Sequence, residues 1–259
     1  HNLLNYMFII QLNIQITLSL YTDLQLIVME GLVGDVYAAL KNYIDSLKDK
    51  SCAIAFSGGL DSSLLLAISN YKFIPYTLGF RTSRDIENAQ KSELLLNINV
   101  KKIYLDDLNI DGYIDELLKI DKNISKMEMG YELVLFILMD FISEKYVVTG
   151  QGADEIFYGY HKFMENPGLS NETYLNRLFN VTLPREKKMA EYYDKELITP
   201  YLNPEILKLR SKITRNVNIN GESNKLILRE IAKNIGIPDS IFNRNKKAAQ
   251  YGSGINRYL

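Results

Sequence analysis

The sequence predicts an α/β fold in which a parallel, twisted β-sheet carries helices on both faces. Short apolar runs alternate along the chain with longer segments of helical periodicity, which is the pattern of strands joined by helical crossovers. Two of these runs, at 52–56 and 145–149, lead directly into glycine-containing turns. Ligands in such sheets bind beyond the carboxyl ends of the strands, so we expect both turns to face one crevice.

Composition narrows the class of protein. The 259 residues allow one large domain or two small ones, and 47% hydrophobic with 24% charged residues is ordinary for a soluble protein. A net charge of −1 provides no basic field for nucleic acid, and no apolar run is long enough to span a membrane. The single cysteine, Cys52, excludes an intramolecular disulfide and a cysteine-rich zinc site. We expect a cytoplasmic location.

The first 29 residues form an N-terminal extension with a strand pattern. Apolar and polar residues alternate from Ile10 to Leu20, which is the period of a half-buried strand rather than of a signal peptide. Three alternatives stay open. The strand joins its own sheet, it pairs with a second subunit in a homodimer, or it lies ahead of a natural start at Met29.

The remaining chain divides into two parts. An amphipathic helix is expected at 30–49, strands at 52–56, 73–80, 100–105 and 145–149, and helices at 85–97, 111–120, 129–143 and from 154 onward. After the break at 165–168 we expect no further strand. Residues 30–165 therefore form the α/β domain, and residues 166–259 a smaller helical lobe that completes the site.

The first motif follows the strand at 52–56 and reads Ser57-Gly58-Gly59-Leu60-Asp61-Ser62-Ser63. Its glycines allow a tight turn and a close approach of backbone to a ligand. The helix that begins here directs free N–H groups into the turn, where a phosphate is the natural occupant. The pattern is not a Walker A loop. An ordinary glycine-rich turn is the alternative.

The second motif follows the strand at 145–149. Gly150 and Gly152 bracket a turn, and Asp154 and Glu155 stand in the first turn of a helix. Acidic residues there suit the helix dipole, so capping is the plain interpretation. Together with a phosphate loop, a Mg²⁺ site becomes the better one, because Mg²⁺ takes one or two carboxylates plus phosphate oxygens. Asp61 and Asp154 are the expected ligands.

The first motif resembles the pyrophosphate-binding loop of the N-type ATP pyrophosphatases. With the Gly-x-Gly-Ala-Asp-Glu-Ile-Phe-x-Gly-Tyr segment at 150–160, it resembles the synthetase domain of the asparagine synthetase family, which includes the β-lactam synthetases. Thr199–Asn203, the Lys-x-x-x-Arg helix start at 225–229 and the basic segment from Arg244 to Gly254 are also similar to that family. The resemblance runs from about residue 30 to the end.

The resemblance implies ATP and Mg²⁺ as cofactors and assigns the site. Nucleotide binding would fall to Ser57, Gly58, Gly59, Leu60, Asp61, Ser62, Ser63, Gly150 and Gly152, with Leu78, Gly79 and Phe80 around the adenine. Lys246, or Lys247 beside it, would stabilise charge on the departing pyrophosphate, although a solvated surface lysine is the alternative. Lys246, Asp61, Asp154 and Gln151 would be catalytic.

Two departures from the family pattern bear on the chemistry. Gln151 stands where the family usually has a glutamate, and an amide neither pairs with an ammonium as a carboxylate does nor takes its proton. A glutaminase domain with its cysteine nucleophile is not present in this sequence, and Cys52 reads as a core residue. Ammonia would then come from solution or from a separate glutaminase subunit. Asn203 in place of an acid reads as structural.

The leading hypothesis is an ATP-dependent, AMP-forming ligase that adenylates a carboxylate, such as aspartate in asparagine biosynthesis, and then transfers the acyl group to ammonia or an amine. The alternatives are a tRNA-modifying or other small-molecule adenylating enzyme and a catalytically silent nucleotide-binding module. The lone His161 near the second motif reads as a surface residue or a substrate contact.

Overall fold

The structure of the protein is a computed structural model that describes residues 28–244 and 249–259. Its sheet has five strands, β1 (Cys52–Ala55), β2 (Ile74–Gly79), β3 (Lys101–Tyr104), β4 (Tyr146–Val148) and β5 (Glu196–Ile198). They lie in the order β3-β2-β1-β4-β5, and every neighbouring pair is parallel. The parallel sheet predicted from the alternating pattern is confirmed.

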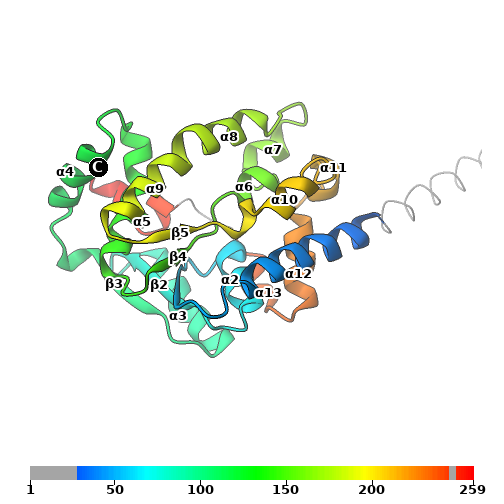
Figure 1. Cartoon of the computed structure of the whole chain (residues 1–259), viewed down its shortest axis with the longest axis horizontal. Helices are drawn as coiled ribbons and strands as arrows, with labels where there is room; N and C mark the ends of the chain where they lie inside the picture. Colours follow the sequence, from blue (N-terminus) through cyan, green and yellow to red (C-terminus); the bar gives the residue numbers. More distant parts are fainter. Residues whose placement is uncertain (1–27, 245–248) are drawn as a thin grey trace, which may run out of the picture.

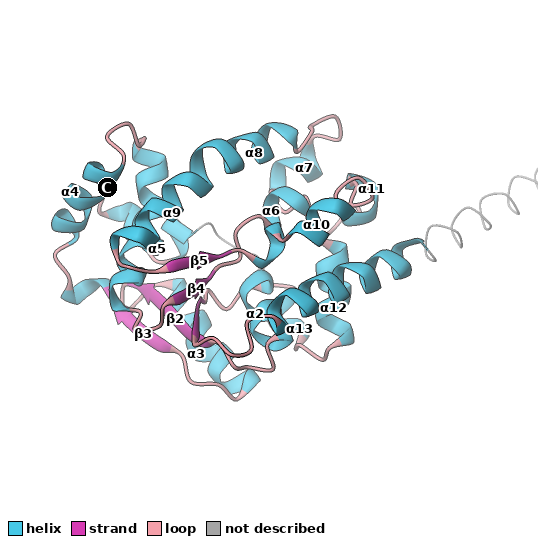
Figure 2. Cartoon of the chain, in the orientation of Figure 1, coloured by secondary structure: helices cyan, strands magenta, loops and turns pink. Residues whose placement is uncertain are grey.

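Helices cover both faces of the sheet (Figures 1 and 2). The first described helix occupies residues 28–45. The longer helices that follow are α2 (Leu60–Ile68), α3 (Arg84–Leu96), α4 (Ile110–Ile120), α5 (Lys126–Phe141), α9 (Leu183–Tyr192) and α12 (Leu226–Asn234). Shorter ones are α6 (Ala153–Ile156), α7 (His161–Glu165), α8 (Glu172–Arg177), α10 (Pro204–Leu209), α11 (Arg215–Asn218), α13 (Asp239–Phe242) and α14 (Ala249–Gly252). The segment Leu178–Thr182 between α8 and α9 is a π-helix, and single 3-10 turns lie at Leu105–Asp107, Pro200–Leu202 and Ile255–Arg257.

Successive residues of the inner strands pack into two separate hydrophobic clusters. Ile54 and Val148 pack into the cluster that includes helix 28–45, α2, α12 and α13, whereas Ala53 and Val147 pack into the cluster built from α4, α5 and α9. Successive side chains of a strand point to opposite faces, so a sheet covered on both sides needs apolar residues at every position. The run Cys52–Ala55 meets that requirement.

The order of the strands contains one switch point. From β1 the chain moves outward through β2 to β3, and it then returns to place β4 and β5 on the other side of β1. Crossover segments on either side of such a point leave a crevice between the carboxyl ends of the two strands. Here those strands are β1 and β4, and the two glycine turns of the sequence follow them directly.

The expectation of no strand after residue 165 is wrong. β5 lies at 196–198 and pairs with β4 at the edge of the sheet. The helices predicted at 85–97, 111–120 and 129–143 are present with small shifts in their bounds, and the helix predicted at 30–49 covers 28–45. The strand expected from Ile10 to Leu20 lies outside the described residues. Of the described helices, none has the length and apolar character needed to cross a membrane.

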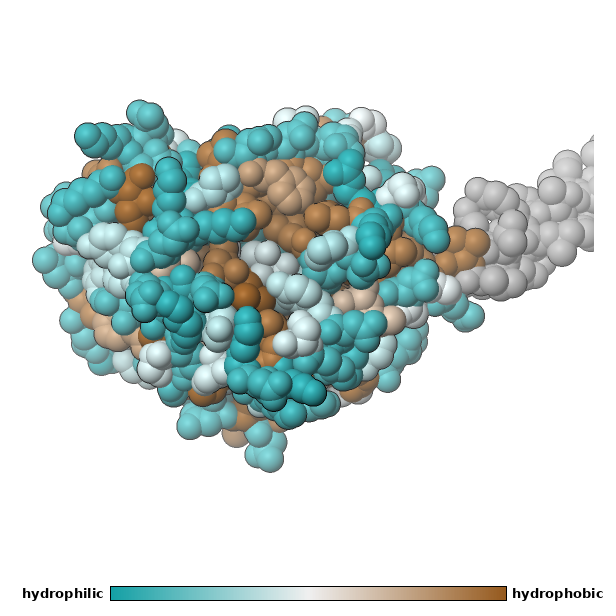
Figure 3. All heavy atoms as spheres, in the orientation of Figure 1, coloured by the Kyte–Doolittle hydropathy of each residue, from teal (hydrophilic) through white to brown (hydrophobic). Residues whose placement is uncertain are grey.

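The surface fits this arrangement. Hydrophilic residues cover most of the face shown in Figure 3, and hydrophobic ones show where the middle of that face is hollowed.

Candidate active site

The loop after β1 takes the form that a phosphate site requires. Gly58 has a φ of +66°, and a Cβ there would lie 2.8 Å from Ser92 Oγ and 3.1 Å from the Asn88 carbonyl oxygen. Gly59 is the N-cap of α2 and has no side chain with which to cap it. The first N–H groups of α2 therefore point into the turn without a side-chain acceptor from their own cap, in the arrangement that attracts anions.

Hydroxyl groups hold this loop in shape. Ser62 Oγ accepts a hydrogen bond from the Ser57 backbone N–H at 3.3 Å and lies 3.5 Å from Ser57 Oγ. Ser63 Oγ is buried without a hydrogen-bond partner among the described residues. The loop thus has hydroxyl groups in addition to backbone N–H groups.

The second glycine turn lies against the first. A Cβ on Gly150 would lie 3.1 Å from Asp61 Cβ and 4.0 Å from the Ser62 backbone nitrogen. The two motifs are about ninety residues apart in the sequence, and they meet because β1 and β4 are neighbours in the sheet. The two motifs that the sequence predicts to face each other are therefore in contact.

Lys225 joins the two acidic residues that the motifs supply. Its Nζ lies 2.7 and 2.9 Å from the two carboxylate oxygens of Asp61 and 2.6 Å from Asp154 Oδ1. The lysine side chain is only 5% exposed. Its backbone adopts a φ of +53° at the N-cap of α12, a conformation that is uncommon and costs free energy for a residue other than glycine.

Gly159 makes room for this contact. A Cβ at that position would lie 2.1 Å from both Asp154 Oδ1 and Lys225 Cε. The Gly159 carbonyl oxygen accepts a hydrogen bond of 2.6 Å from the Asn224 side chain, which fixes the residue just before the lysine. The turn after α6 and the start of α12 are therefore locked together around the ion pairs.

The donor set at this point fits Mg²⁺. Two carboxylates from different elements converge on one cation, and here the cation is the lysine ammonium. Mg²⁺ in nucleotide sites is typically held by one or two carboxylates together with phosphate oxygens and water. Asp61 and Asp154 supply that number directly beside the phosphate loop, as the sequence predicts.

Gln151 faces a buried acid rather than the open crevice. Its Nε2 donates a hydrogen bond of 2.9 Å to Glu186 Oε1 on α9. Burial, and after it the proximity of Glu132 and Glu155, raises the pKa of Glu186 well above its ordinary value. Glu186 Oε2 has no hydrogen-bond partner among the described residues. The position at which the resemblance implies a glutamate is thus occupied here by an amide that contacts a buried carboxyl group of raised pKa.

Glu155 does not act as a helix cap. Its carboxylate accepts a short hydrogen bond from the Tyr160 hydroxyl, and its backbone oxygen accepts one of 2.9 Å from Asn171 Nδ2. Burial, followed by the charge of Asp154, raises its pKa. Of the two acidic residues in this turn, only Asp154 points to the crevice.

The segment expected around an adenine lies at the end of β2, next to β1. Leu78 is buried in the core below, and Gly79 and Phe80 complete the strand end. The Phe80 backbone N–H donates a hydrogen bond of 3.0 Å to the Ser253 carbonyl oxygen. The last residues of the chain therefore lie along this strand end.

The basic segment near the C-terminus begins at the phosphate loop. Arg244 Nη1 donates a hydrogen bond of 3.1 Å to the Gly58 carbonyl oxygen. Lys246 and Lys247 lie outside the described residues, and their roles stay predictions.

Three other residues have positions that fit the structural or surface roles favoured by the sequence. Asn203 accepts hydrogen bonds from the N–H groups of Glu205 and Ile206 as the N-cap of α10. The His161 side chain is 77% exposed and lies 3.3 Å from Glu165. Cys52 is buried in the core, and burial raises the pKa of its thiol to about 11.

Lys225 and Glu186 are the candidate site residues that sequence reasoning passed over. Lys225 stands in a segment matched to the family, yet nothing in the local pattern distinguishes a site lysine from a surface lysine at a helix start. Glu186 is surrounded in sequence by Arg185, Lys187 and Lys188, which reads as a solvated charged run.

Comparisons with known proteins identify relatives of this chain. Solved structures include a predicted subunit of a tRNA methyltransferase from Methanocaldococcus jannaschii, at 20% identity and a TM-score of 0.35 over 76% of this chain and 94% of that one; a likeness this weak adds nothing to the argument. A candidate glutamine-hydrolyzing asparagine synthetase of the same organism is 27% identical over 84% of this chain and 50% of its own length. An asparagine synthetase domain-containing protein of Saccharomyces cerevisiae is 35% identical over 40% of this chain and 20% of its own length.

The chain thus spans half or less of the length of these curated relatives. The model of the asparagine synthase family matches residues 38–178 and 169–258, which together include both glycine motifs, Lys225 and the basic C-terminal segment. Family membership implied by the motifs is confirmed. The chain belongs to the asparagine synthase family.

Proposed function

We propose that the protein is an ATP-dependent ligase that activates a carboxylate as its acyl-adenylate and transfers the acyl group to ammonia or an amine. The observation that carries the proposal is the convergence of Asp61 and Asp154 on one cationic position, Lys225 Nζ, beside the phosphate loop. Family membership supports an ATP-dependent ligase in general, and the site residues support the chemistry that follows.

In this proposal the chain's own groups bind and orient the nucleotide. The N–H groups at the start of α2 and the hydroxyls of Ser57 and Ser62 bind the β- and γ-phosphates. Asp61 and Asp154 hold Mg²⁺, which when bound supplies positive charge against the phosphates. Lys225, and Lys246 by resemblance, stabilise negative charge as pyrophosphate departs.

The proposed reaction has two steps that balance. An oxygen of the substrate carboxylate attacks the α-phosphorus of ATP, the bond to the bridging oxygen breaks, and pyrophosphate leaves with that bond's electron pair. The nitrogen of ammonia or an amine then attacks the acyl carbon, and AMP leaves with the original carboxylate oxygen. The amine must also lose a proton. Gln151 cannot accept it, so the acceptor is a different group or the bulk solvent.

A catalytically silent nucleotide-binding module is the second candidate, and one observation favours it. Gln151 donates its amide to Glu186 instead of presenting a carboxylate to the crevice. Such a module would bind ATP and Mg²⁺ without turnover.

One experiment separates the two candidates. The chain is incubated with ATP, Mg²⁺, ammonium and a panel of carboxylic acids that includes aspartate, and pyrophosphate and AMP are measured. With an ¹⁸O-labelled carboxylate, adenylation transfers one label to AMP. ATP binding without pyrophosphate across the panel would favour the silent module, and the absence of ATP binding would overturn both.

A pair of variants assigns the activity to this site. Asp61→Asn should lower the rate of pyrophosphate release by about 100-fold or more, since it removes one of the two carboxylates that would hold Mg²⁺ against the phosphates. Asp49→Asn makes the same chemical change at an exposed position after helix 28–45 and should leave the rate unchanged. Equal rates in the two variants would contradict the assignment of Asp61.

A further inference from the structure

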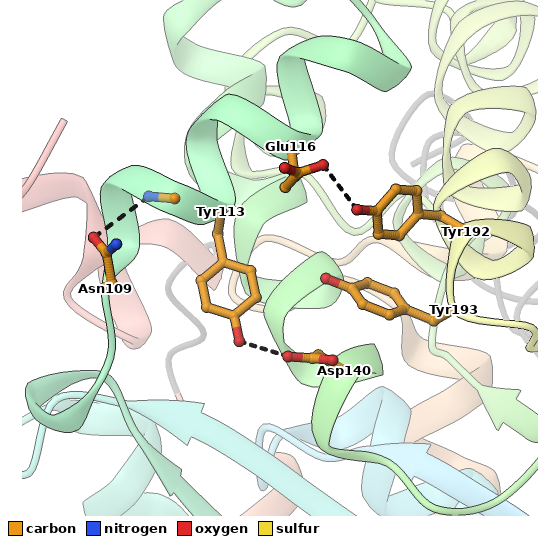
Figure 4. A pocket seen from close by; sticks show the side chains of 7 residues that line it. Asn109, Tyr113, Glu116, Asp140, Tyr192 and Tyr193 are labelled. Carbon is orange, nitrogen blue, oxygen red and sulfur yellow. Dashed lines mark hydrogen bonds between the residues drawn. The ribbon is translucent and has the colours of Figure 1, made fainter.

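A second candidate site lies on the surface between α4 and the C-terminal ends of α5 and α9 (Figure 4). It is a pocket of about 420 Å³ whose wall includes Tyr113 and Glu116 of α4, Asp140 of α5, and Tyr192 and Tyr193 at the end of α9. The ends of α5 and α9 precede β4 and β5, whereas the glycine turns follow β1 and β4. The pocket therefore lies away from the candidate active site.

The base of the pocket is aromatic and rigid. Phe136 is fully buried behind it, with ring centroids 6.4 Å from Tyr113, 5.5 Å from Tyr192 and 4.9 Å from Tyr193. The rings of Tyr192 and Tyr193 also meet edge to face, with centroids 4.9 Å apart. Tilted and edge-to-face pairs of this kind hold each other in place, so the tyrosine rings form a fixed wall.

The two carboxyl groups of the pocket accept hydrogen bonds from its tyrosines. The Tyr113 hydroxyl donates a hydrogen bond of 2.6 Å to Asp140 Oδ2, and the Tyr192 hydroxyl donates one of 2.8 Å to Glu116 Oε2. Hydrogen bonds from Lys119 and then Tyr192 lower the pKa of Glu116, and Glu116 Oε1 forms an ion pair of 2.5 Å with Lys119 Nζ, which lies outside the lining. No lysine or arginine is among the described residues that line the pocket.

Tyr193 forms part of the wall of the pocket. Its hydroxyl points into the space between Tyr113 and Tyr192, and it makes no hydrogen bond to any described residue (Figure 4). Burial raises the pKa of this hydroxyl, and the nearby Asp140 raises it further. The contribution of Asp140, unlike that of burial, comes from negative charge beside the hydroxyl, and that charge attracts a cation.

We propose that this pocket binds a guanidinium group. Cations bind over tyrosine faces, and a planar guanidinium both stacks on aromatic rings and donates paired hydrogen bonds to carboxylates. Glu116 and Asp140 lie on different sides of the tyrosine wall, which suits a donor with several N–H groups in one plane. A compact alkylammonium would use the charge without using the flat surface. The group belongs either to a free guanidino compound or to an arginine side chain of another polypeptide.

Calorimetric or NMR titration of the chain tests the proposal. Ethylguanidinium and N-acetylarginine amide should bind saturably, and butylammonium should bind about tenfold more weakly, since it lacks stacking and paired donation. Asp140→Asn should weaken ethylguanidinium binding by about tenfold. Tyr251→Phe, an exposed tyrosine on α14, is the matched surface control and should leave binding unchanged.

A second acid variant and a peptide that contains arginine complete the test. If Asp140→Asn does not fold, as judged by its melting curve, Glu116→Gln replaces it with the same expected loss. A peptide with one central arginine identifies the source, because tighter binding than N-acetylarginine amide indicates a polypeptide and equal binding a free compound. The proposal is overturned if no guanidinium compound binds saturably, or if binding is the same in the wild type and in the acid variants.

Discussion

Gly159 contributes to the candidate site by having no side chain. The space that its Cβ would occupy is taken by Asp154 Oδ1 and by Lys225 Cε, both 2.1 Å from that point. Steric exclusion at this distance cannot be relieved by a small rotation, because the lysine is also held by Asp61. Any side chain here must separate Lys225 from one of its two carboxylates.

We therefore expect Gly159→Ala to lower kcat/KM for pyrophosphate release by about 100-fold, since displacement of site groups by roughly 1 Å costs that much. Steady-state kinetics with varied ATP measure it. Gly221→Ala is the matched control, because a Cβ at Gly221 meets nothing within 4 Å. A Gly159→Ala enzyme as active as the control would show that the contact between Lys225 and Asp154 is dispensable.

At this scale the sequence predicts the motifs better than their partners. The phosphate loop, Asp61 and Asp154 were identifiable because glycines and acids recur at fixed spacing around a turn. Lys225 was not, because its role depends on a contact across 164 positions of the chain. Only the three-dimensional packing of α12 against α2 brings that ammonium to the loop.

Helices α5 and α9 are joined by a buried charge cluster. Arg185 of α9 donates hydrogen bonds to Glu128 and Glu132 of α5, at 3.1 Å each from its Nη1, and to Asp121 at 2.7 Å from its Nε. Burial raises the pKa of Glu132 to about 7, although the hydrogen bond from Arg185 opposes that shift. For Glu128 burial also opposes ionisation, but hydrogen bonds from Ser125 and Arg185 outweigh it and lower the pKa to about 2.

These shifts give a pH dependence with a definite sign. The folded protein holds the proton of Glu132 more tightly than the unfolded chain does. Its contribution to the free energy of unfolding is therefore complete below an ordinary pKa of about 4.3 and is lost as pH rises through about 7. Glu132→Gln should remove this loss, which is at most about 1.4 kcal/mol per pH unit.

Urea unfolding of the wild type and of Glu132→Gln between pH 5 and pH 8 tests this expectation. The difference in unfolding free energy should shift in favour of the variant as pH rises. Glu191→Gln, an exposed position on α9, should follow the wild type throughout. Parallel curves for the wild type and Glu132→Gln would contradict a raised pKa. The contribution of Glu128 to stability changes over a different pH range, because it is lost only as pH falls from about 4.3 to about 2.

The longer elements were predicted correctly from the sequence, and the shortest strand was not. The helices α3, α4 and α5 contain several turns of apolar spacing, which is enough for a periodic pattern to be visible. Strand β5 has three residues, Glu196–Ile198, with one apolar residue on each face of an edge strand. Three residues do not establish a period, and β5 is specified by its pairing with β4 rather than by its own sequence.

One of the two hydrophobic clusters extends across the boundary predicted at residues 165–166. A single hydrophobic cluster includes Leu40 of the first described helix, Leu64 of α2 and Ile227 of α12, and β5 completes the same sheet. The division into an α/β domain and a helical lobe stays a prediction about architecture. A shared core indicates that the two parts unfold together.

Differential scanning calorimetry tests this cooperativity. We expect one transition in which the calorimetric and van't Hoff enthalpies agree, as they do for a single cooperative unit. Two resolved transitions would show that residues 166–259 unfold independently despite the shared core.

Lys225 competes with a metal ion for the same two carboxylates. Its ammonium contends with any divalent cation for Asp61 and Asp154 at an effective concentration that dilution cannot lower. The apparent affinity for the metal alone equals the intrinsic affinity multiplied by the fraction of molecules in which Lys225 has left the two carboxylates. Lys225→Met should consequently bind Mn²⁺ more tightly than the wild type when nucleotide is absent, as measured by electron paramagnetic resonance. Phosphates in the loop would give the displaced ammonium a new anion, so by linkage nucleotide and metal should each strengthen the binding of the other.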